Sequence, residues 1–298
     1  MPENKQISLG EAITHIGDGA HIAIGGSQLR RHPIAAVHEL VRQGKKDLTV
    51  YGLGNTVDFD LLVGAGCVTE AHTSSVDLGE AGQTRNLERA MENGKIRFIE
   101  HSENSAISRF RAGAFDISFI PSKMAPSSDA SADNEYSSTV ECPFTGEPYV
   151  ALRAFAPDFA LIHAHWADRL GNIALDHRYP MDDEADALIA RSAKLVIVTV
   201  EQVVSEETFA EDSVQTLLPK ELVDLVIETP YGAHPTSCDS VYDHDADHLQ
   251  FYDEVTRTTD GAARYLKEHV FETKSWTVYL DCIGLSRLME LTRKRGVV

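Results

Sequence analysis

The segment Ile99–Ser105, IEHSENS, contains the acidic residue whose chemistry matters most in this sequence. An apolar stretch ends there and a polar turn begins, so Glu103 is predicted to lie at the edge of a sheet. A carboxylate at such an edge can attack a substrate or accept a proton, and the neighbouring Asn104 can bind one. The alternative is an ordinary solvated carboxylate in a loop, and the surrounding residues decide between the two.

The segment Asp18–Pro33, DGAHIAIGGSQLRRHP, is the second stretch that could bind a substrate. Paired glycines at a strand end leave backbone N–H groups open to a ligand, and such donors suit an anion or a developing oxyanion. The arginines that follow place positive charge on a very acidic chain. The predicted binding groups are Gly25, Gly26, Ser27, Arg30 and Arg31. A tight strand-to-helix turn with solvated arginines explains the same residues equally well.

Other polar residues give weaker signals. Ser74 and Ser75 follow a strand end and could donate to a substrate carboxylate, with loop capping as an equal alternative. His163 and His165 alternate on a strand and share one face, but no third ligand stands nearby in the sequence, so packing or hydrogen bonding is favoured over a metal site. The stretch Tyr242–Glu254 lacks the glycine and spacing of a calcium loop and is predicted to be a solvated acidic surface. We therefore expect no bound metal.

Strands alternate with helices along most of the chain, and these elements must position the polar residues. Ser8 and Glu11 have capping-box spacing, and His21–Ile24 is predicted to be a strand that ends at the two glycines. Further strands are predicted within 47–55, 67–75, 95–104, 117–122, 159–166, 173–176, 194–204 and 222–230, and helices within 32–47, 59–66, 84–94, 105–116, 182–193, 248–258 and 261–270. This pattern predicts an α/β fold with an open parallel or mixed sheet flanked by helices and a helical C-terminal extension.

The stretch 123–149 interrupts the alternation. It is rich in Ser, Pro, Asp and Glu and is predicted to be a long loop excursion. The alternation resumes after it, so a single domain over residues 1–298 is the expected organisation.

Composition excludes several functional classes. The net charge is −19 and no basic face is apparent, which argues against a nucleic-acid partner. No apolar run approaches the roughly 20 residues of a membrane span, and the first residues lack the apolar core of a signal peptide. The cysteines are far apart and form no C-x-x-C pair, which favours reduced thiols in the cytoplasm: Cys67, Cys142, Cys238 and Cys282. A salt-adapted source remains an open alternative for the acidity.

The Asp18–Pro33 segment resembles the signature of the α subunits of family I coenzyme A transferases. The matching residues are Asp18, Gly19, Ile22, Ala23, Ile24, Gly25, Gly26 and Pro33. Ser27 stands where the signature has Phe, and Arg31 where it has a second Gly. A pair of basic residues before the Pro is similar to the glutaconate CoA-transferase branch. Segments such as PFTGE, LIHAHWADRLGN and YGAHPTSCDSVYDHD extend the resemblance over nearly the whole chain.

The resemblance implies the α subunit of a heteromeric CoA-transferase with the open α/β sheet of that family. The substrates would be an acyl-CoA and a carboxylic acid, with glutaconate-like dicarboxylates favoured, and no cofactor would be bound. The nucleophilic glutamate would belong to a partner β subunit, in an assembly of α2β2 or larger. HSENS imitates the Ser-Glu-Asn-Gly motif of that nucleophile, with Ser105 in place of Gly. It follows the third predicted strand, however, later than the β-subunit nucleophile does.

The same family leaves two alternatives open for Glu103. The family includes ring-cleaving hydrolases of steroid breakdown, whose α-type subunit has an important glutamate near this point, and a decarboxylase variant. IEHSENSAISRF resembles that hydrolase region. In this alternative the complex hydrolyses an acyl-CoA, opens a ring or decarboxylates, and Glu103 acts as the base. A non-catalytic acyl-CoA-binding subunit is the third possibility.

Overall fold

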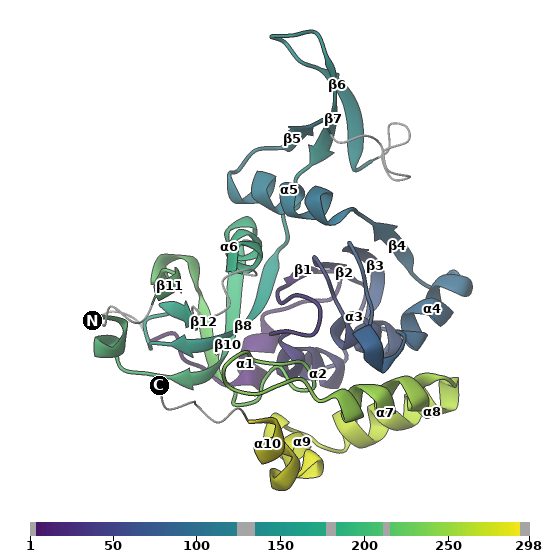
Figure 1. Ribbon diagram of the computed structural model, residues 1–298, viewed down its shortest axis with the longest axis vertical. Helices are drawn as coiled ribbons and strands as arrows, with labels where there is room; N and C mark the ends of the chain where they lie inside the picture. The colour runs from purple at the N-terminus through teal and green to yellow at the C-terminus, as the bar shows by residue number, and fades with distance from the viewer. Residues whose placement is uncertain (1–3, 124–134, 177–182, 211–214, 293–298) are drawn as a thin grey trace.

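A nine-stranded sheet forms the centre of the computed structural model, which describes residues 4–123, 135–176, 183–210 and 215–292 (Figure 1). Its main path runs β11-β9-β8-β1-β2-β3-β4, and β10 joins β8 to β12. The strands are β1 (His21–Ile24), β2 (Leu48–Tyr51), β3 (Val68–Thr73), β4 (Arg97–Glu100), β8 (Phe159–Ala167), β9 (Ile173–Leu175), β10 (Leu195–Val203), β11 (Gln215–Leu218) and β12 (Leu225–Glu228). Among these described strands only the β8–β9 and β9–β11 pairs are antiparallel, so the predicted open, mixed sheet is confirmed.

Helices cover both faces of the sheet because its strands are apolar on both sides. Ile22 and Ile24 pack into one core and the intervening Ala23 into the other, as the two-residue period of a strand requires. The first core lies under α1–α4, and the second lies under α5 and α6. Their bounds are α1 (Leu9–Thr14), α2 (Ile34–Arg42), α3 (Val57–Gly64), α4 (Arg85–Glu92), α5 (Glu103–Ala114) and α6 (Asp183–Ser192).

The C-terminal part is helical, as predicted. It contains α7 (Ala246–Thr256), α8 (Thr259–Tyr265), the π-helix η6 (Leu266–Phe271), α9 (Trp276–Ile283) and α10 (Leu285–Leu291). Short 3-10 turns occur elsewhere at η1 (Gly79–Ala81), η4 (Glu206–Ala210) and η5 (Lys220–Leu222). None of the helices in the described ranges combines the length and the apolar character needed to cross a bilayer.

The prediction that Tyr242–Glu254 is a solvated acidic surface holds for Asp247 and Glu254, which are exposed, and is wrong for the rest of its acidic residues apart from the partly buried Asp243. Tyr242, Asp245, Tyr252 and Asp253 are all buried. The buried carboxylates have cationic partners from distant segments: Arg287 reaches Asp245 at 2.5 Å, and Arg85 reaches Asp253 at 2.9 Å. Aromatic and acidic residues share the inner face of α7, and a local sequence pattern does not reveal these distant arginines.

A small antiparallel sheet projects beyond α5, away from the large sheet (Figure 1). It consists of β5 (Phe119–Ser122), β6 (Ser137–Glu141) and β7 (Pro148–Arg153), in the order β5-β7-β6. The interval 123–149 is therefore not a loop throughout, because β6 and the start of β7 lie in it; residues 124–134 fall outside the described ranges. Turn residues that suggested a loop close a β6–β7 hairpin, in which the Cys142 N–H donates to the Glu147 carbonyl at 2.8 Å.

Candidate functional site

The carboxyl ends of β1–β4 meet at one edge of the sheet, the edge where ligands bind in open α/β folds. Backbone bonds join the loops there. Ser27 pairs with Gly54, and the Gln28 N–H donates to the Gly54 carbonyl at 2.8 Å. The Asn55 N–H donates to the Ser75 carbonyl at 2.9 Å. The structure thus brings together Ser27 and Ser75, two residues that the sequence singled out separately.

The N–H groups of the Gly-Gly loop are already used within the protein. Gly25 donates to the Leu161 carbonyl at 2.9 Å, and Ser27 donates to the Arg30 carbonyl at 3.0 Å. The Gly26 N–H donates to Oδ1 of Asp186 at 2.9 Å. All three N–H groups thus have protein acceptors, and one of these acceptors is the buried carboxylate of Asp186. Their binding of an anionic ligand stays a prediction.

The two arginines of this loop differ in accessibility. Arg31 is only 3% exposed, and its Nη1 lies 2.6 Å from Oδ2 of Asp186. The alternative that Arg31 is a solvated arginine is therefore wrong, and its role in substrate binding stays a prediction. The side chain of Arg30 retains 30% exposure, 3.6 Å from Asp239, and a ligand at this edge can reach it.

Ser74 and Ser75 follow β3 and have different environments. The Ser74 hydroxyl donates to the Leu53 carbonyl. This bond within the protein agrees with the alternative that Ser74 caps the loop. Ser75 is exposed, and its Oγ lies 3.7 Å from where a Cβ on Gly54 would stand. Of the two serines, Ser75 therefore has the side chain that a substrate can reach.

Glu103 is the first residue of α5, not a loop residue, and it follows the fourth strand rather than the third. Both Glu103 and Asn104 are exposed. Ser102 caps the helix by accepting the Ser105 N–H at 3.2 Å. The positive end of the helix dipole favours a charged carboxylate at this position. The His101 N–H donates to the Thr73 carbonyl at 2.9 Å. The Ser102–Ser105 segment after β4 therefore lies beside the Ser74–Ser75 turn after β3.

A buried histidine pair beside this segment was missed by the sequence reasoning. Nδ1 of His72 lies 3.1 Å from Nε2 of His101, and Nε2 of His72 lies 2.7 Å from Glu70. Tyr136, which directly precedes β6, donates to the same Glu70 at 2.6 Å. Burial lowers the pKa of both imidazoles, that of His101 to about 3. Glu70 and His72 are two residues apart on β3, so their side chains lie on the same face of the strand. This spacing is the sequence signal that could have revealed the contact between them.

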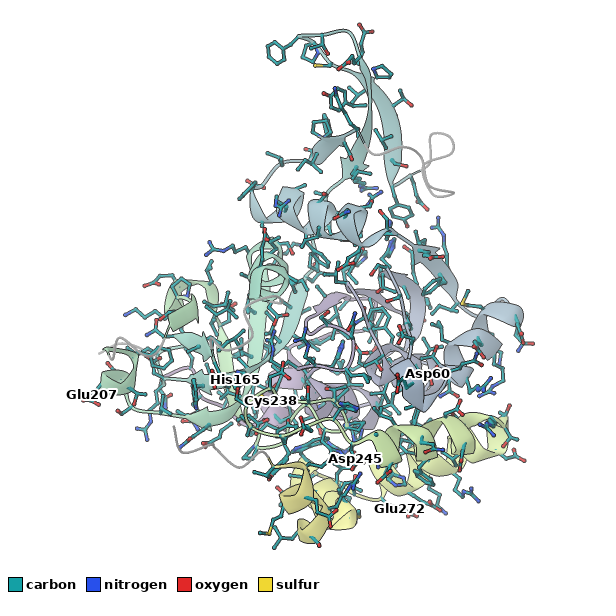
Figure 2. All side chains as sticks on the ribbon, in the orientation of Figure 1. Asp60, His165, Glu207, Cys238, Asp245 and Glu272 are labelled. Atoms are coloured by element: carbon teal, nitrogen blue, oxygen red, sulfur yellow. The ribbon has the colours of Figure 1, made fainter. Side chains whose placement is uncertain are left out.

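A second polar group includes His163 of β8 and Cys238; Figure 2 labels Cys238 and the nearby His165. Ligand atoms of His163, Glu201 and Cys238 lie within 4.8 Å of one another, so two potential ligands accompany His163 that its sequence neighbourhood does not show. The His163 ring nitrogens contact Thr199 at 2.9 Å and Glu201 at 2.8 Å. Burial raises the pKa of the Cys238 thiol, which keeps it protonated. These contacts favour a hydrogen-bond network.

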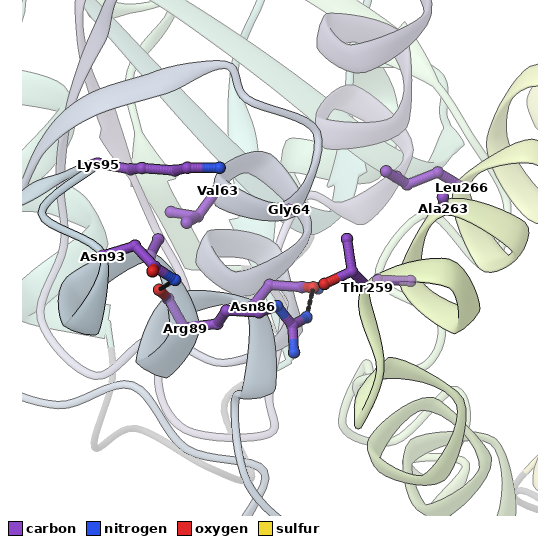
Figure 3. A pocket seen from close by; sticks show the side chains of 11 residues that line it. Val63, Gly64, Asn86, Arg89, Asn93, Lys95, Thr259, Ala263 and Leu266 are labelled. Atoms are coloured by element: carbon purple, nitrogen blue, oxygen red, sulfur yellow. Dashed lines mark hydrogen bonds between the residues drawn. The ribbon is translucent and has the colours of Figure 1, made fainter.

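A groove of about 300 Å³ lies between α3, α4 and α8 (Figure 3). Its lining includes the last two residues of α3, Asn93 after the end of α4, and two cations, Arg89 and Lys95. The carboxyl ends of these helices lie at the opposite sheet edge from Ser27 and Ser75, and cations are favoured there by the helix dipoles. The groove is therefore separate from the candidate site.

Comparison with known proteins places the chain among enzymes that act on coenzyme A esters. The sequence profile of the family described as Coenzyme A transferase matches residues 7–229. One subunit of the glutaconate CoA-transferase of Acidaminococcus fermentans is 32% identical over 307 residues, covering 97% of this chain and 94% of that protein. The crystal structure of that transferase superposes with a TM-score of 0.92, covering 98% of this chain and 96% of the other.

Two further relatives differ in length or activity. An uncharacterised protein of Archaeoglobus fulgidus is 33% identical over 98% of this chain, and the chain spans only 65% of its length. The structure of the decarboxylase AibA/AibB, in a cysteine-to-serine variant, has a chain that is 36% identical with a TM-score of 0.77; the match covers 90% of this chain and 100% of that one.

Proposed function

Since this chain belongs to the coenzyme A transferase family, we propose that it is the α subunit of a heteromeric enzyme that transfers CoA between an acyl-CoA and a carboxylic acid. The observation that carries the proposal is the full-length match to the glutaconate CoA-transferase subunit of Acidaminococcus fermentans, at a TM-score of 0.92. We propose further that the whole chain is a single domain and that it assembles with a β subunit as α2β2 or a larger oligomer. We also propose that the enzyme is cytoplasmic.

The chemistry requires a carboxylate nucleophile, which we assign to the β subunit. That carboxylate attacks the thioester carbonyl and expels CoA thiolate, forming a mixed anhydride. The thiolate then attacks the enzyme's carbonyl, releasing the first acid and leaving an enzyme thioester; a second acid takes the CoA by the reverse steps. The CoA thioester is thus a substrate, and no resident cofactor is needed. The proposed substrate contacts of this chain are the partly exposed Ser27 and the exposed Ser75 and Asn104.

Short dicarboxylic acids are the proposed substrate class. The transferase that matches this chain over nearly its whole length is named for glutaconate, a dicarboxylate. Arg30 supports the assignment, because it leaves a partly exposed cation on the loop that contains Ser27. A guanidinium there can bind the carboxylate of the acid that does not react.

The proposal is tested by reconstitution. Mass spectrometry of co-purified protein identifies the partner, and the mixture is assayed with a panel of acyl-CoA esters and acids. The mixed subunits should exchange CoA between acids with ping-pong kinetics, and this chain alone should not. Transfer by the isolated chain would contradict the assignment of the nucleophile to the partner.

Decarboxylation or hydrolysis on the same scaffold is the second candidate. The AibA/AibB chain is 36% identical to this one, and Glu103 is exposed at a helix start, where it can act as a base. The partner sequence distinguishes the two, because a nucleophilic glutamate there supports transfer and another residue supports this alternative. If the partner lacks such a residue and the complex shows no turnover, the chain is instead a non-catalytic subunit that binds acyl-CoA.

A further inference from the structure

We propose that Asp186 is a positioning residue, whose buried carboxylate holds the loop Gly25–Arg31 in the conformation that presents Ser27 and Gln28 at the sheet edge. The inference rests on the proposed function only for its effect on turnover. The clamp itself is a property of the fold and can be measured without any substrate.

Asp186 uses both carboxylate oxygens on this one loop. It lies on α6, about 160 residues further along the chain, and is 1% exposed. Oδ1 accepts the Gly26 N–H at 2.9 Å, and Oδ2 accepts Nη1 of Arg31 at 2.6 Å. Charge-assisted bonds of this kind are about twice as strong as neutral ones. The carboxylate therefore joins the first part of the loop to its last residue.

The loop needs such a clamp because its backbone is unfavourable. Gly26, Gln28 and Arg31 have φ values of +92°, +53° and +53°. Side chains other than glycine rarely adopt this left-handed region, and they remain there only when the surrounding structure enforces it. The strained residues are Gln28 and Arg31, because glycine adopts a positive φ freely. Asp186 contacts Arg31 directly and also holds Gly26, which lies on the other side of Gln28.

The paired glycines fit this role better than they fit a ligand. A Cβ on Gly25 would lie 2.6 Å from Oδ1 of Asp186, so the first glycine leaves room for the carboxylate. A Cβ on Gly26 would lie 2.7 Å from the Arg30 carbonyl oxygen, so the second lets the loop fold back on itself. Gly25, Gly26, Arg31 and Asp186 thus form one unit.

The clamp acts on the site through Ser27 and Gln28. Both residues lie inside the clamped stretch and pair with Gly54, next to the exposed Ser75. Releasing Gly26 and Arg31 would let Ser27 and Gln28 move away from Ser75. Displacements of about 1 Å in a positioning group can reduce a rate by about 100-fold.

The test compares Asp186→Asn with a matched control, Asp60→Asn, in the complete enzyme with its partner. Asp60 is also fully buried, and it accepts Tyr252 at 2.6 Å, Asn86 at 2.9 Å and the Leu87 N–H at 2.8 Å, away from the loop. D186N should lose about 10-fold to 100-fold in kcat/KM, whereas D60N, which also loses a buried carboxylate, should keep its activity. Gly25→Ala, which crowds the carboxylate from the other side, should reproduce the D186N effect.

Amide hydrogen exchange of residues 25–31 supplies a second measurement. Exchange there should accelerate in D186N and G25A but not in D60N, even if the wild-type complex shows no transfer and the proposed function fails. Unchanged exchange in both loop variants would overturn the clamp. Unchanged kcat/KM in a D186N enzyme with accelerated exchange, or an equal activity loss in D60N, would overturn the positioning role. If D186N does not assemble, G25A decides by the same criteria.

Discussion

The loop Gly25–Arg31 and the segment Ser102–Ser105 lie at the same sheet edge but use their polar groups in different ways. In the loop, the Gly25, Gly26 and Ser27 N–H groups all have protein acceptors, and Arg31 is buried. In the second segment, Ser102 caps α5 while Glu103 and Asn104 are exposed. The comparison shows that a cluster of donors and charges can serve to shape a site, while the groups accessible to a substrate stand beside it.

Replacing Arg31 by Met should have the largest effect. The change would leave the Asp186 carboxylate buried without its cation, and removing one partner of a buried pair costs about 3–5 kcal/mol of unfolding free energy. Urea unfolding of R31M measures this loss. The matched control is Arg30→Met, because its partner is 3.6 Å away and its side chain is partly exposed, so that it should lose less than about 1 kcal/mol. Similar losses for both would contradict the contrast between buried and exposed groups.

Local patterns predicted the elements at this edge well. The strand His21–Ile24 was predicted with its observed bounds, because an apolar run stands between a glycine turn and the paired glycines. The capping box of Ser8 and Glu11 is also present. In both cases the residues that decide the structure are close in the chain.

Features that depend on distant partners could not be predicted. Asp186 lies in the helix predicted within 182–193, and nothing in a single sequence connects it with Gly26 and Arg31. Likewise, Asp245 is buried because Arg287 reaches it, and its acidic neighbours suggested a surface instead. Of the small sheet, β5 was predicted within 117–122, but β6 and β7 were missed because Ser, Pro, Asp and Glu dominate the stretch 123–149.

Mild acid should loosen the Ser102–Ser105 segment. Burial lowers the pKa of His101 from 6.5 to about 3, so its neutral ring stabilises the fold above pH 6.5, and this contribution is lost as the pH falls towards 3. At pH 5 the free energy of unfolding should be about 2 kcal/mol lower than at neutral pH. The protection factors of amides 102–105, which are corrected for the slower intrinsic exchange at lower pH, should therefore fall between pH 7 and pH 5. His101→Phe should reduce this change, and an unaltered pH response in that variant would refute the assignment.

Replacing Ser102 by Ala should weaken the start of α5 by about 1 kcal/mol, the usual effect of losing an N-cap side chain. Ser8→Ala is the control, because Ser8 caps α1 in the same way at a different position. Thermal unfolding should show similar losses in both variants. Only S102A should also reduce turnover, because it alone frees the residues next to Glu103. Equal activity in both would mean that the geometry of this helix start does not matter to the reaction.

Replacing Glu103 by Gln should have the smallest effect if transfer uses a glutamate of the partner. The change keeps size and hydrogen bonding but removes charge and basicity, and an exposed first helix residue contributes little to the core. Assembly should be unchanged, no acyl group should be trapped on this chain, and turnover should fall by less than about 10-fold, whereas loss of a general base costs about 100-fold to 10,000-fold. Asn104→Ala in the same assay shows how much the segment contributes by contact alone. A fall in the larger range with assembly intact, together with a wild-type complex that makes no acyl-transfer product, would move the chemistry to this chain and favour decarboxylation or hydrolysis.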